Sequence, residues 1–168
     1  KYDLIMNINV RAGFILSHKV LPHMLERNYG HILMMSPPVD TSVMRNHGAY
    51  GVSKFGMSMI AQAIAEECED KGVTAHALWP ATAVETAATI NFGLGNTAMW
   101  RTPEILADAS LELLTKDPQT CVGKAWIDED VLKEAGITDF TKYRCDPEHE
   151  PPHLSIKDIP PVSAPPTS

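Results

Sequence analysis

The sequence has little of what defines several large classes of protein. Of its 168 residues, 14 are Lys or Arg and 21 are Asp or Glu, so the formal net charge is −7. Domains that bind nucleic acids usually carry a basic face, and this balance argues against such a partner. No apolar run approaches the roughly 18 residues of a membrane-spanning helix, so we expect no membrane span.

Cysteine is also scarce. Cys68, Cys121 and Cys145 are odd in number and widely spaced, which fits neither a disulfide framework nor a zinc pattern. The seven histidines are scattered without metal-ligand spacing, so the sequence predicts no metal site. The scarcity of cysteine predicts a reducing compartment, but the sequence does not tell which one.

What is present indicates one α/β domain. Helical spacing of apolar residues predicts a helix over 1–27, in which Pro22 should bend or interrupt the last turns. Gly30 is expected to form its left-handed cap. Short apolar runs without polar alternation predict strands buried on both faces, as in a parallel sheet with helices on its faces. The expected order is helix 1–27, strand 31–36, helix 49–72, strand 73–79, a mobile segment 81–101, helix 103–115 and strand 121–128.

The composition changes near residue 146. Residues 146–168 hold seven of the 13 prolines and little that can form a core. We therefore predict a domain over 1–145 and a proline-rich tail over 146–168, which is either extended and poorly ordered or lies across another surface.

Tyr50 and Lys54 are four residues apart on a predicted helix, and so share one face of it. An unperturbed phenol has a pKa of about 10, which a nearby ammonium lowers. A tyrosine adjusted in this way exchanges protons with an alcohol or a ketone. The spacing alone is weak evidence, because a core tyrosine beneath a solvated lysine stem gives the same pattern.

The neighbouring motifs are more specific. The chain contains, in this order, "NINVRAGF", "GHILMMS", "AYGVSKFGMSM", "GVTAHALWPATAVETA", "TPEILADASLELL" and "CVGKAWID". This colinear series resembles the later half of the short-chain dehydrogenase/reductases. The resemblance implies a Rossmann-like doubly wound parallel sheet, an NAD or NADP cofactor and an alcohol or carbonyl substrate.

The resemblance also implies roles for single residues. Tyr50 would be the catalytic acid/base, and Lys54 would lower its pKa and hold the nicotinamide ribose. Asn9 would join the lysine to a proton-relay water, although a helical asparagine also bonds backbone locally. The positions that would contact the nicotinamide carboxamide are Pro80, Val84 and Thr86, and Pro80 is equally consistent with a simple strand terminator.

The sequence departs from the family pattern at two positions. The serine that polarises the substrate carbonyl normally lies thirteen residues before the tyrosine, where this chain has Pro37, which has no side-chain donor. Either Ser36 takes the role, or Thr41 or Ser42 supplies it, or the site lacks it. The second departure is Ala81, which stands where the family usually has glycine.

A dinucleotide site also needs a glycine-rich turn between a strand and a helix. This sequence has none, because "FGLGN" at 92–96 follows no predicted strand. We therefore expect only the later half of the fold, without the phosphate-binding strands. The earlier part would be cleaved, supplied by another chain, or truly absent.

The remaining expectations concern partners. Small and apolar residues after the second strand favour an apolar substrate; they are Ala87, Ala88, Ile90, Phe92, Leu94, Met99 and Trp100. The helices near 1–28 and 48–71 are those through which members of the family commonly form homo-oligomers. The alternative is a non-catalytic fragment or scaffold subunit that reuses the fold for assembly, which Pro37 and the missing glycine-rich turn favour.

Overall fold

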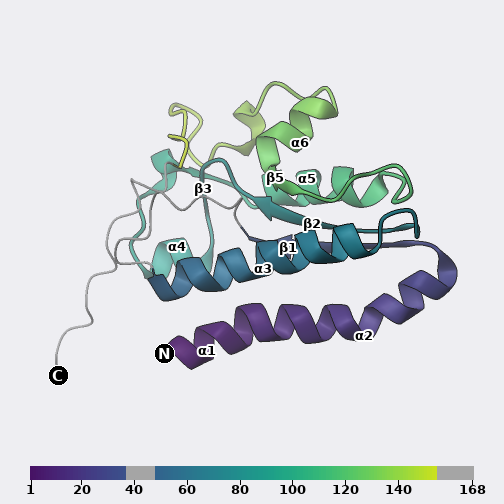
Figure 1. Cartoon of the computed structure of the whole chain (residues 1–168). Coiled ribbons are helices and arrows are strands. Elements are labelled where there is room, and N and C mark those ends of the chain that lie inside the picture. The colour runs from purple at the N-terminus through teal and green to yellow at the C-terminus, as the bar shows by residue number, and fades with distance from the viewer. Residues whose placement is uncertain (37–47, 155–168) are drawn as a thin grey trace.

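A three-stranded parallel sheet lies at the centre of the computed structural model, which describes residues 1–36 and 48–154 (Figure 1). The strands are β1 (Gly30–Met35), β2 (Val73–Trp79), β3 (Ala83–Val84), β4 (Trp100–Arg101) and β5 (Ala125–Ile127). The helices are α1 (Tyr2–Met6), α2 (Ala12–Arg27), α3 (Gly48–Glu67), α4 (Ala87–Asn91), α5 (Glu104–Thr115) and α6 (Asp128–Glu134). Three further turns are a π-helical one (Asn7–Arg11) and two 3-10 ones (Thr97–Met99 and Thr141–Tyr143).

The sheet has the order β1-β2-β5, and the crossover between its first two strands contains α3. Met35 is paired with Leu78 and Leu78 with Trp126, so the three strands end at one edge of the sheet. The first turn of α3 lies at that same end of the molecule, on the left in Figure 1. In parallel α/β sheets the carboxyl edge of the strands is where ligands bind.

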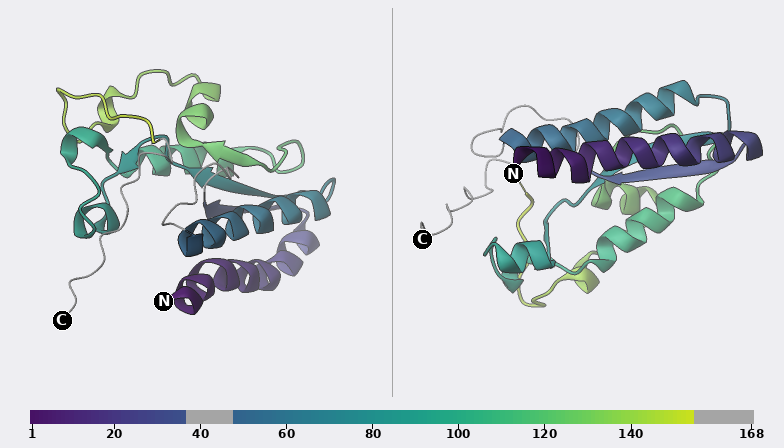
Figure 2. Two further views of the ribbon diagram at one scale, coloured as in Figure 1. Left: turned by 60° about the vertical axis from the view of Figure 1, so that its left-hand side comes forward. Right: turned by 90° about the horizontal axis from the view of Figure 1, so that it is seen from below.

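Helices cover both faces of the sheet, as the predicted α/β class requires (Figure 2). Ala75 and Ala77 of β2 belong to the core beneath α2 and α3, whereas Leu78 belongs to the core beneath α5 and α6. This division follows from the alternation of side chains along a strand. The fold class and the predicted strands at 31–36 and 73–79 are confirmed, and the predicted strand at 121–128 is shorter, at Ala125–Ile127.

One expectation about the first helix is wrong. Asn28, not Gly30, takes the left-handed conformation, and the amides of Asn28 and Tyr29 bond back to the last turn of α2. Gly30 is instead the first residue of β1, where an added Cβ would lie 2.5 Å from Cγ of Met24. Pro22 lies inside α2, which continues to Arg27 without interruption.

The segment 81–101 is more regular than expected. It contains β3, α4 and β4, and the two short strands pair in parallel. The beginning of the tail lies across this region, because Thr82 forms an antiparallel bridge with His153.

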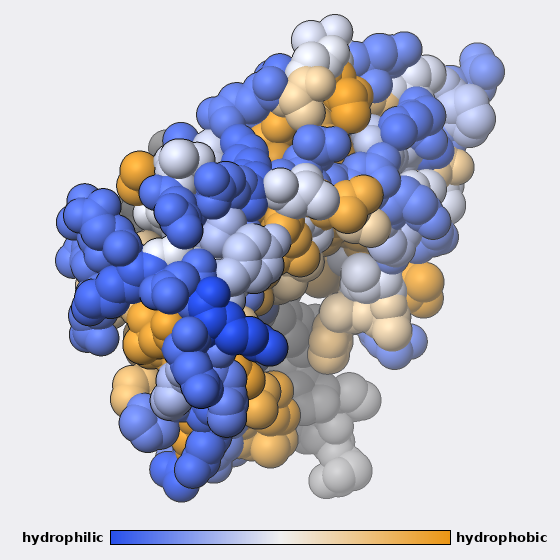
Figure 3. All heavy atoms as spheres, turned by 90° about the vertical axis from the view of Figure 1, so that its right-hand side faces the viewer, coloured by the Kyte–Doolittle hydropathy of each residue, from blue (hydrophilic) through white to orange (hydrophobic). Residues whose placement is uncertain are grey.

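Among the described residues, no helix combines the length and apolar character needed to cross a membrane. The end of the molecule on the right in Figure 1 is covered largely by hydrophilic residues, with apolar ones between them (Figure 3).

Candidate active site

Tyr50 and Lys54 occupy the first turns of α3, at the carboxyl edge of the sheet. The ammonium of Lys54 donates a hydrogen bond of 2.7 Å to the carbonyl oxygen of Met35, the last residue of β1. Its Nζ lies 5.9 Å from the centre of the Tyr50 ring. The helical spacing therefore places the two side chains together, and the lysine also ties α3 to the end of the strand.

The electrostatic environment of the pair differs from the sequence expectation. Tyr50 remains 38% exposed, but partial burial of its ring raises the pKa of the phenol above its ordinary value. Partial burial also lowers the pKa of the Lys54 ammonium. The expected lowering of the Tyr50 pKa is therefore absent from this arrangement, in which Lys54 bonds a carbonyl rather than the phenol. A tyrosine in this state carries its proton at neutral pH.

Asn9 reaches α3 through a residue that the sequence did not single out. It lies in the π-helical turn, where the amide of Ala12 bonds back five residues to the carbonyl of Asn7. The Nδ2 of Asn9 donates to Oγ of Ser53 at 2.9 Å, and Ser53 donates to the carbonyl of Tyr50 at 2.8 Å. Asn9 thus holds the turn that carries Tyr50. Ser53 is fully buried, and only its place one turn from Tyr50 could have pointed to it.

Ser36 follows β1 directly and is also fully buried. Its Oγ lies 3.0 Å from Oγ of Ser58, a residue of α3, and its amide donates to the carbonyl of Leu78. The hydroxyl is therefore engaged inside the protein, between β1 and α3. The alternatives Thr41 and Ser42, like Pro37 itself, lie outside the described residues.

The segment after β2 continues along the same edge. Pro80 comes directly after the strand, and Val84 is buried in β3. Thr86 is the amino-terminal cap of α4, and its Oγ1 accepts from the amide of Thr89 at 3.2 Å. The structure brings Tyr50 and Lys54 together at the start of α3, beside the end of β1, while the Ser36 hydroxyl faces Ser58 instead. No bond joins Thr86 to them among the described residues.

The apolar residues after β3 divide into two groups. Ile90, Phe92 and Met99 are exposed. Trp100 is buried instead, and its indole nitrogen donates to the carbonyl of Leu94 at 2.9 Å. Trp100 therefore belongs to the interior, and the exposed residues alone remain as candidates for contact with an apolar substrate.

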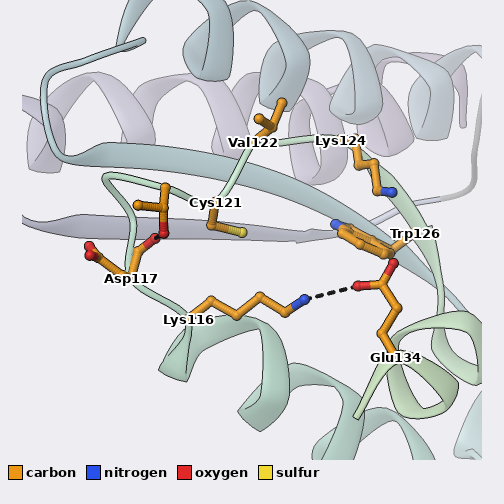
Figure 4. A pocket seen from close by; sticks show the side chains of 8 residues that line it. Lys116, Asp117, Cys121, Val122, Lys124, Trp126 and Glu134 are labelled. Atoms are coloured by element: carbon orange, nitrogen blue, oxygen red, sulfur yellow. Dashed lines mark hydrogen bonds and ion pairs between the residues drawn. The ribbon is translucent and has the colours of Figure 1, made fainter. Parts of the chain in front are cut away.

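A pocket of about 480 Å³ opens at the opposite end of the sheet, and no predicted site residue lines it (Figure 4). The ammonium groups of Lys116 and Lys124 lie over the Trp126 ring, and Lys116 also bonds Glu134. These contacts pair both lysines of the lining with other residues of the lining. The chemistry expected from the sequence lies at the other edge, beside Tyr50.

Comparison with known proteins identifies a family for the chain. The family model described as short chain dehydrogenase matches residues 1–95, which include Asn9, Ser36, Tyr50 and Lys54. The chain belongs to the short-chain dehydrogenase family. Within that family it is 40% identical over 152 residues to hydroxysteroid dehydrogenase-like protein 2 of Danio rerio. The alignment covers 89% of this chain and 36% of the relative, so the chain spans about a third of the length of the curated relatives it matches.

Solved structures of short-chain dehydrogenases share the fold. A short chain dehydrogenase from Mycobacterium thermoresistibile superposes with a TM-score of 0.79 at 35% identity, covering 98% of this chain and 60% of that one. A metagenomic short-chain oxidoreductase, solved in complex with NADP, superposes with a TM-score of 0.58 at 22% identity. That match covers 75% of this chain and 51% of the other, and it shows the likeness of fold alone.

Proposed function

We propose that this chain forms the catalytic, nicotinamide-side half of an NAD(P)-dependent oxidoreductase that acts on an apolar alcohol or carbonyl compound. The observation that carries the proposal is the cluster at the carboxyl edge of the sheet. There Tyr50 presents a partly exposed phenol beside Lys54, whose position is fixed by the carbonyl of Met35. Family membership supplies the expectation of NAD or NADP.

The residues present suit the nicotinamide end of such a cofactor. A phenol and an ammonium stand at the edge where β1 ends, and the segment from Pro80 to Thr86 continues that edge from the end of β2. Nicotinamide cofactors supply the hydride, while the protein orients them and handles the proton. Among the described residues, no glycine-rich turn joins a strand to a helix. The proposal therefore assigns no residue to the pyrophosphate.

The proton chemistry follows from the state of the phenol. Because desolvation raises its pKa, Tyr50 holds its proton at neutral pH and is suited to donate it to a carbonyl oxygen during reduction. Lys54 would hold ribose hydroxyls when it releases the Met35 carbonyl. Asn9 acts through Ser53, by fixing the turn on which Tyr50 stands.

The substrate and the assembly are part of the same proposal. Exposed apolar side chains at Ile90, Phe92 and Met99 follow the cofactor segment and would face an apolar substrate. The helices near 1–28 and 48–71 would join a second copy of the chain. Their exposed apolar residues support this and include Ile8, Phe14, Leu16, Val52 and Met59.

Tyr50→Phe tests the catalytic proposal. We expect turnover of ketones with NADPH or NADH to fall by a hundredfold or more, because the ring stays while the transferable proton is lost. Tyr29→Phe is the matched control, since Tyr29 is an exposed phenol at the other end of the sheet. Unchanged turnover in Tyr50→Phe would overturn the proposal. Binding should be checked separately by NADPH fluorescence, where the two variants should agree.

A non-catalytic scaffold is the second candidate. The observation that favours it is the hydroxyl of Ser36, which is buried against Ser58 rather than exposed beside Tyr50. A scaffold would show neither NADPH nor NADH binding and no effect of Tyr50→Phe. The same two measurements therefore separate the candidates.

A further inference from the structure

The segment that follows β2 is held by bonds to parts of the chain far away in sequence. The amide of Ala81 donates to Oδ1 of Asp128 at 2.8 Å, and the carbonyl of Ala81 accepts from the amide of Leu154 at 2.7 Å. The next residue, Thr82, is fully buried and forms an antiparallel bridge with His153. Both backbone groups of Ala81 are thus fixed, one by the start of α6 and one by the tail.

The continuation of the segment is held by β4. Val84 pairs with Arg101, and the amide of Glu85 donates to the carbonyl of Arg101 at 2.9 Å. The backbone of Arg101 therefore fixes the last part of the segment, just before Thr86 caps α4. On its other side, Arg101 forms a bridge with Arg144, so the residues just before the tail lie against β4 as well.

The side chain of Arg101 connects these supports to one another. Its guanidinium is 1% exposed and donates to Glu129 at 2.5 Å and to Glu150 at 2.9 Å. Glu129 follows Asp128 in the first turn of α6, and Glu150 lies in the tail. One arginine therefore joins β4, α6 and the tail, the three elements that hold residues 81–86. Arg144 also bonds Glu150, within the tail.

Glu129 keeps this network charged. Burial alone would raise its pKa, but hydrogen bonds from Lys133, Arg101 and His153 outweigh that effect and hold the pKa at about 2. The carboxylate is therefore ionised at any pH at which the protein would work. A buried guanidinium with two carboxylate partners has few alternative arrangements, because leaving any of the charges unpaired in the interior is costly.

We propose that Arg101, Asp128 and Glu129 are positioning residues that fix the 81–86 segment against the nicotinamide end of the cofactor. This inference rests on the proposed function, since it concerns the same edge of the sheet. None of the three bonds Tyr50 or Lys54. They act through the backbone of the segment, where a displacement of about 1 Å is enough to lower a reaction rate substantially.

Two substitutions test the proposal: Arg101→Lys, with the larger expected effect, and Glu150→Gln, with the smaller one. Arg101→Lys keeps the positive charge but loses the guanidinium that donates to two carboxylates at once. Glu150→Gln weakens only the bond between Arg101 and the exposed Glu150. Lys116→Met is the matched control, because it also breaks an ion pair to α6, at Glu134, but at the other end of the sheet. Amide hydrogen exchange is the first readout. Protection of residues 81–86 should fall at least tenfold in Arg101→Lys and less in Glu150→Gln, while α3 and the control stay unchanged.

The second readout is kinetic, with NADPH and NADH as probes. Arg101→Lys should raise the KM for the nucleotide and lower kcat by about tenfold, whereas Lys116→Met should alter neither. Exchange that rises equally over the whole chain would show a merely structural role and overturn the inference. So would unchanged protection of 81–86. If Tyr50→Phe keeps full turnover while the local exchange result holds, the proposed function fails and the support of the segment stands.

Discussion

The two layers of helices that cover the sheet are built differently. Beneath α5 and α6 the core contains large side chains that are completely buried, among them Leu78, Ile105, Leu113 and Leu132. Beneath α2 and α3 the sheet offers smaller residues, such as Ala75 and Ala77. The outer sides differ in the opposite sense, because α2 and α3 carry seven exposed large apolar residues, whereas α5 and α6 carry two.

This contrast means that the two layers differ in whether they need a partner beyond the sheet. A helix with a single apolar side can bury that side against the sheet and needs no further partner. α5 largely meets that description. A layer that is apolar on both sides leaves one side unsatisfied, and Leu16 is 64% exposed on α2. The layer that carries Tyr50 is thus also the one that the proposed second copy would cover, so the proposed assembly and the candidate site would share α3.

Leu113→Ala should have the largest effect on the fold. This residue of α5 is completely buried in the core, so the free energy of unfolding should fall by about 2–5 kcal/mol. Leu16→Ala is the matched change on the other layer and should cost less than about 0.5 kcal/mol in a dilute single chain. Urea unfolding of both variants measures the difference. Equal losses would remove the contrast, because they would mean that Leu16 is covered.

His76 should give the next largest effect, by making the free energy of unfolding depend on pH. It is buried on β2, where the Trp126 indole donates to its Nδ1 at 3.2 Å, so the proton of the neutral ring lies on Nε2, facing Cys121. Burial lowers the pKa of His76 from 6.5 to about 4, with help from the neighbouring His31 and from the charges of Lys116 and Lys124.

The folded pKa lies below the unfolded one, so the folded protein binds fewer protons between pH 4 and 6.5. Stability is therefore full above pH 6.5 and falls as the pH drops towards 4, by about 2 kcal/mol at pH 5. Urea midpoints at pH 7.5 and 5 measure this, and His76→Gln should flatten the dependence. His23→Gln, on the exposed side of α2, should leave it as it is. An equal slope in both variants would contradict the assignment to His76.

Much of the fold could be predicted because its signals are local. The runs at 31–36 and 73–79 are apolar without alternation, which is what strands covered on both faces require. The cap of α2 was misplaced because Gly30 is a glycine for another reason, its contact with Met24. That contact depends on how α2 meets β1, which no local pattern records.

The candidate site was predictable only in part. Helical spacing places Tyr50 beside Lys54, but the bond from Lys54 to Met35 and the link from Asn9 through Ser53 join residues far apart in sequence. Asp128 was predicted to end the strand at 121–128, and Glu129 was not singled out. Acidic side chains are seldom fully buried, so neither residue was expected in the interior. Arg101, the partner of Glu129, stands 28 residues from it, so the network became visible only in three dimensions.

Leu16→Asp should have the smallest effect on the folded chain and a clear one on assembly. The side chain points into solvent in a single chain, so the free energy of unfolding at low concentration should change by less than about 0.5 kcal/mol. If a second copy covers α2, the charge would be buried there, and the dissociation constant from sedimentation equilibrium should rise at least tenfold. Leu111→Asp is the matched control on α5, where Leu111 is 61% exposed, and it should leave the association unchanged. Equal weakening by both variants would mean that the two layers do not differ in their partners, and a chain that stays monomeric before any substitution would contradict the proposed assembly itself.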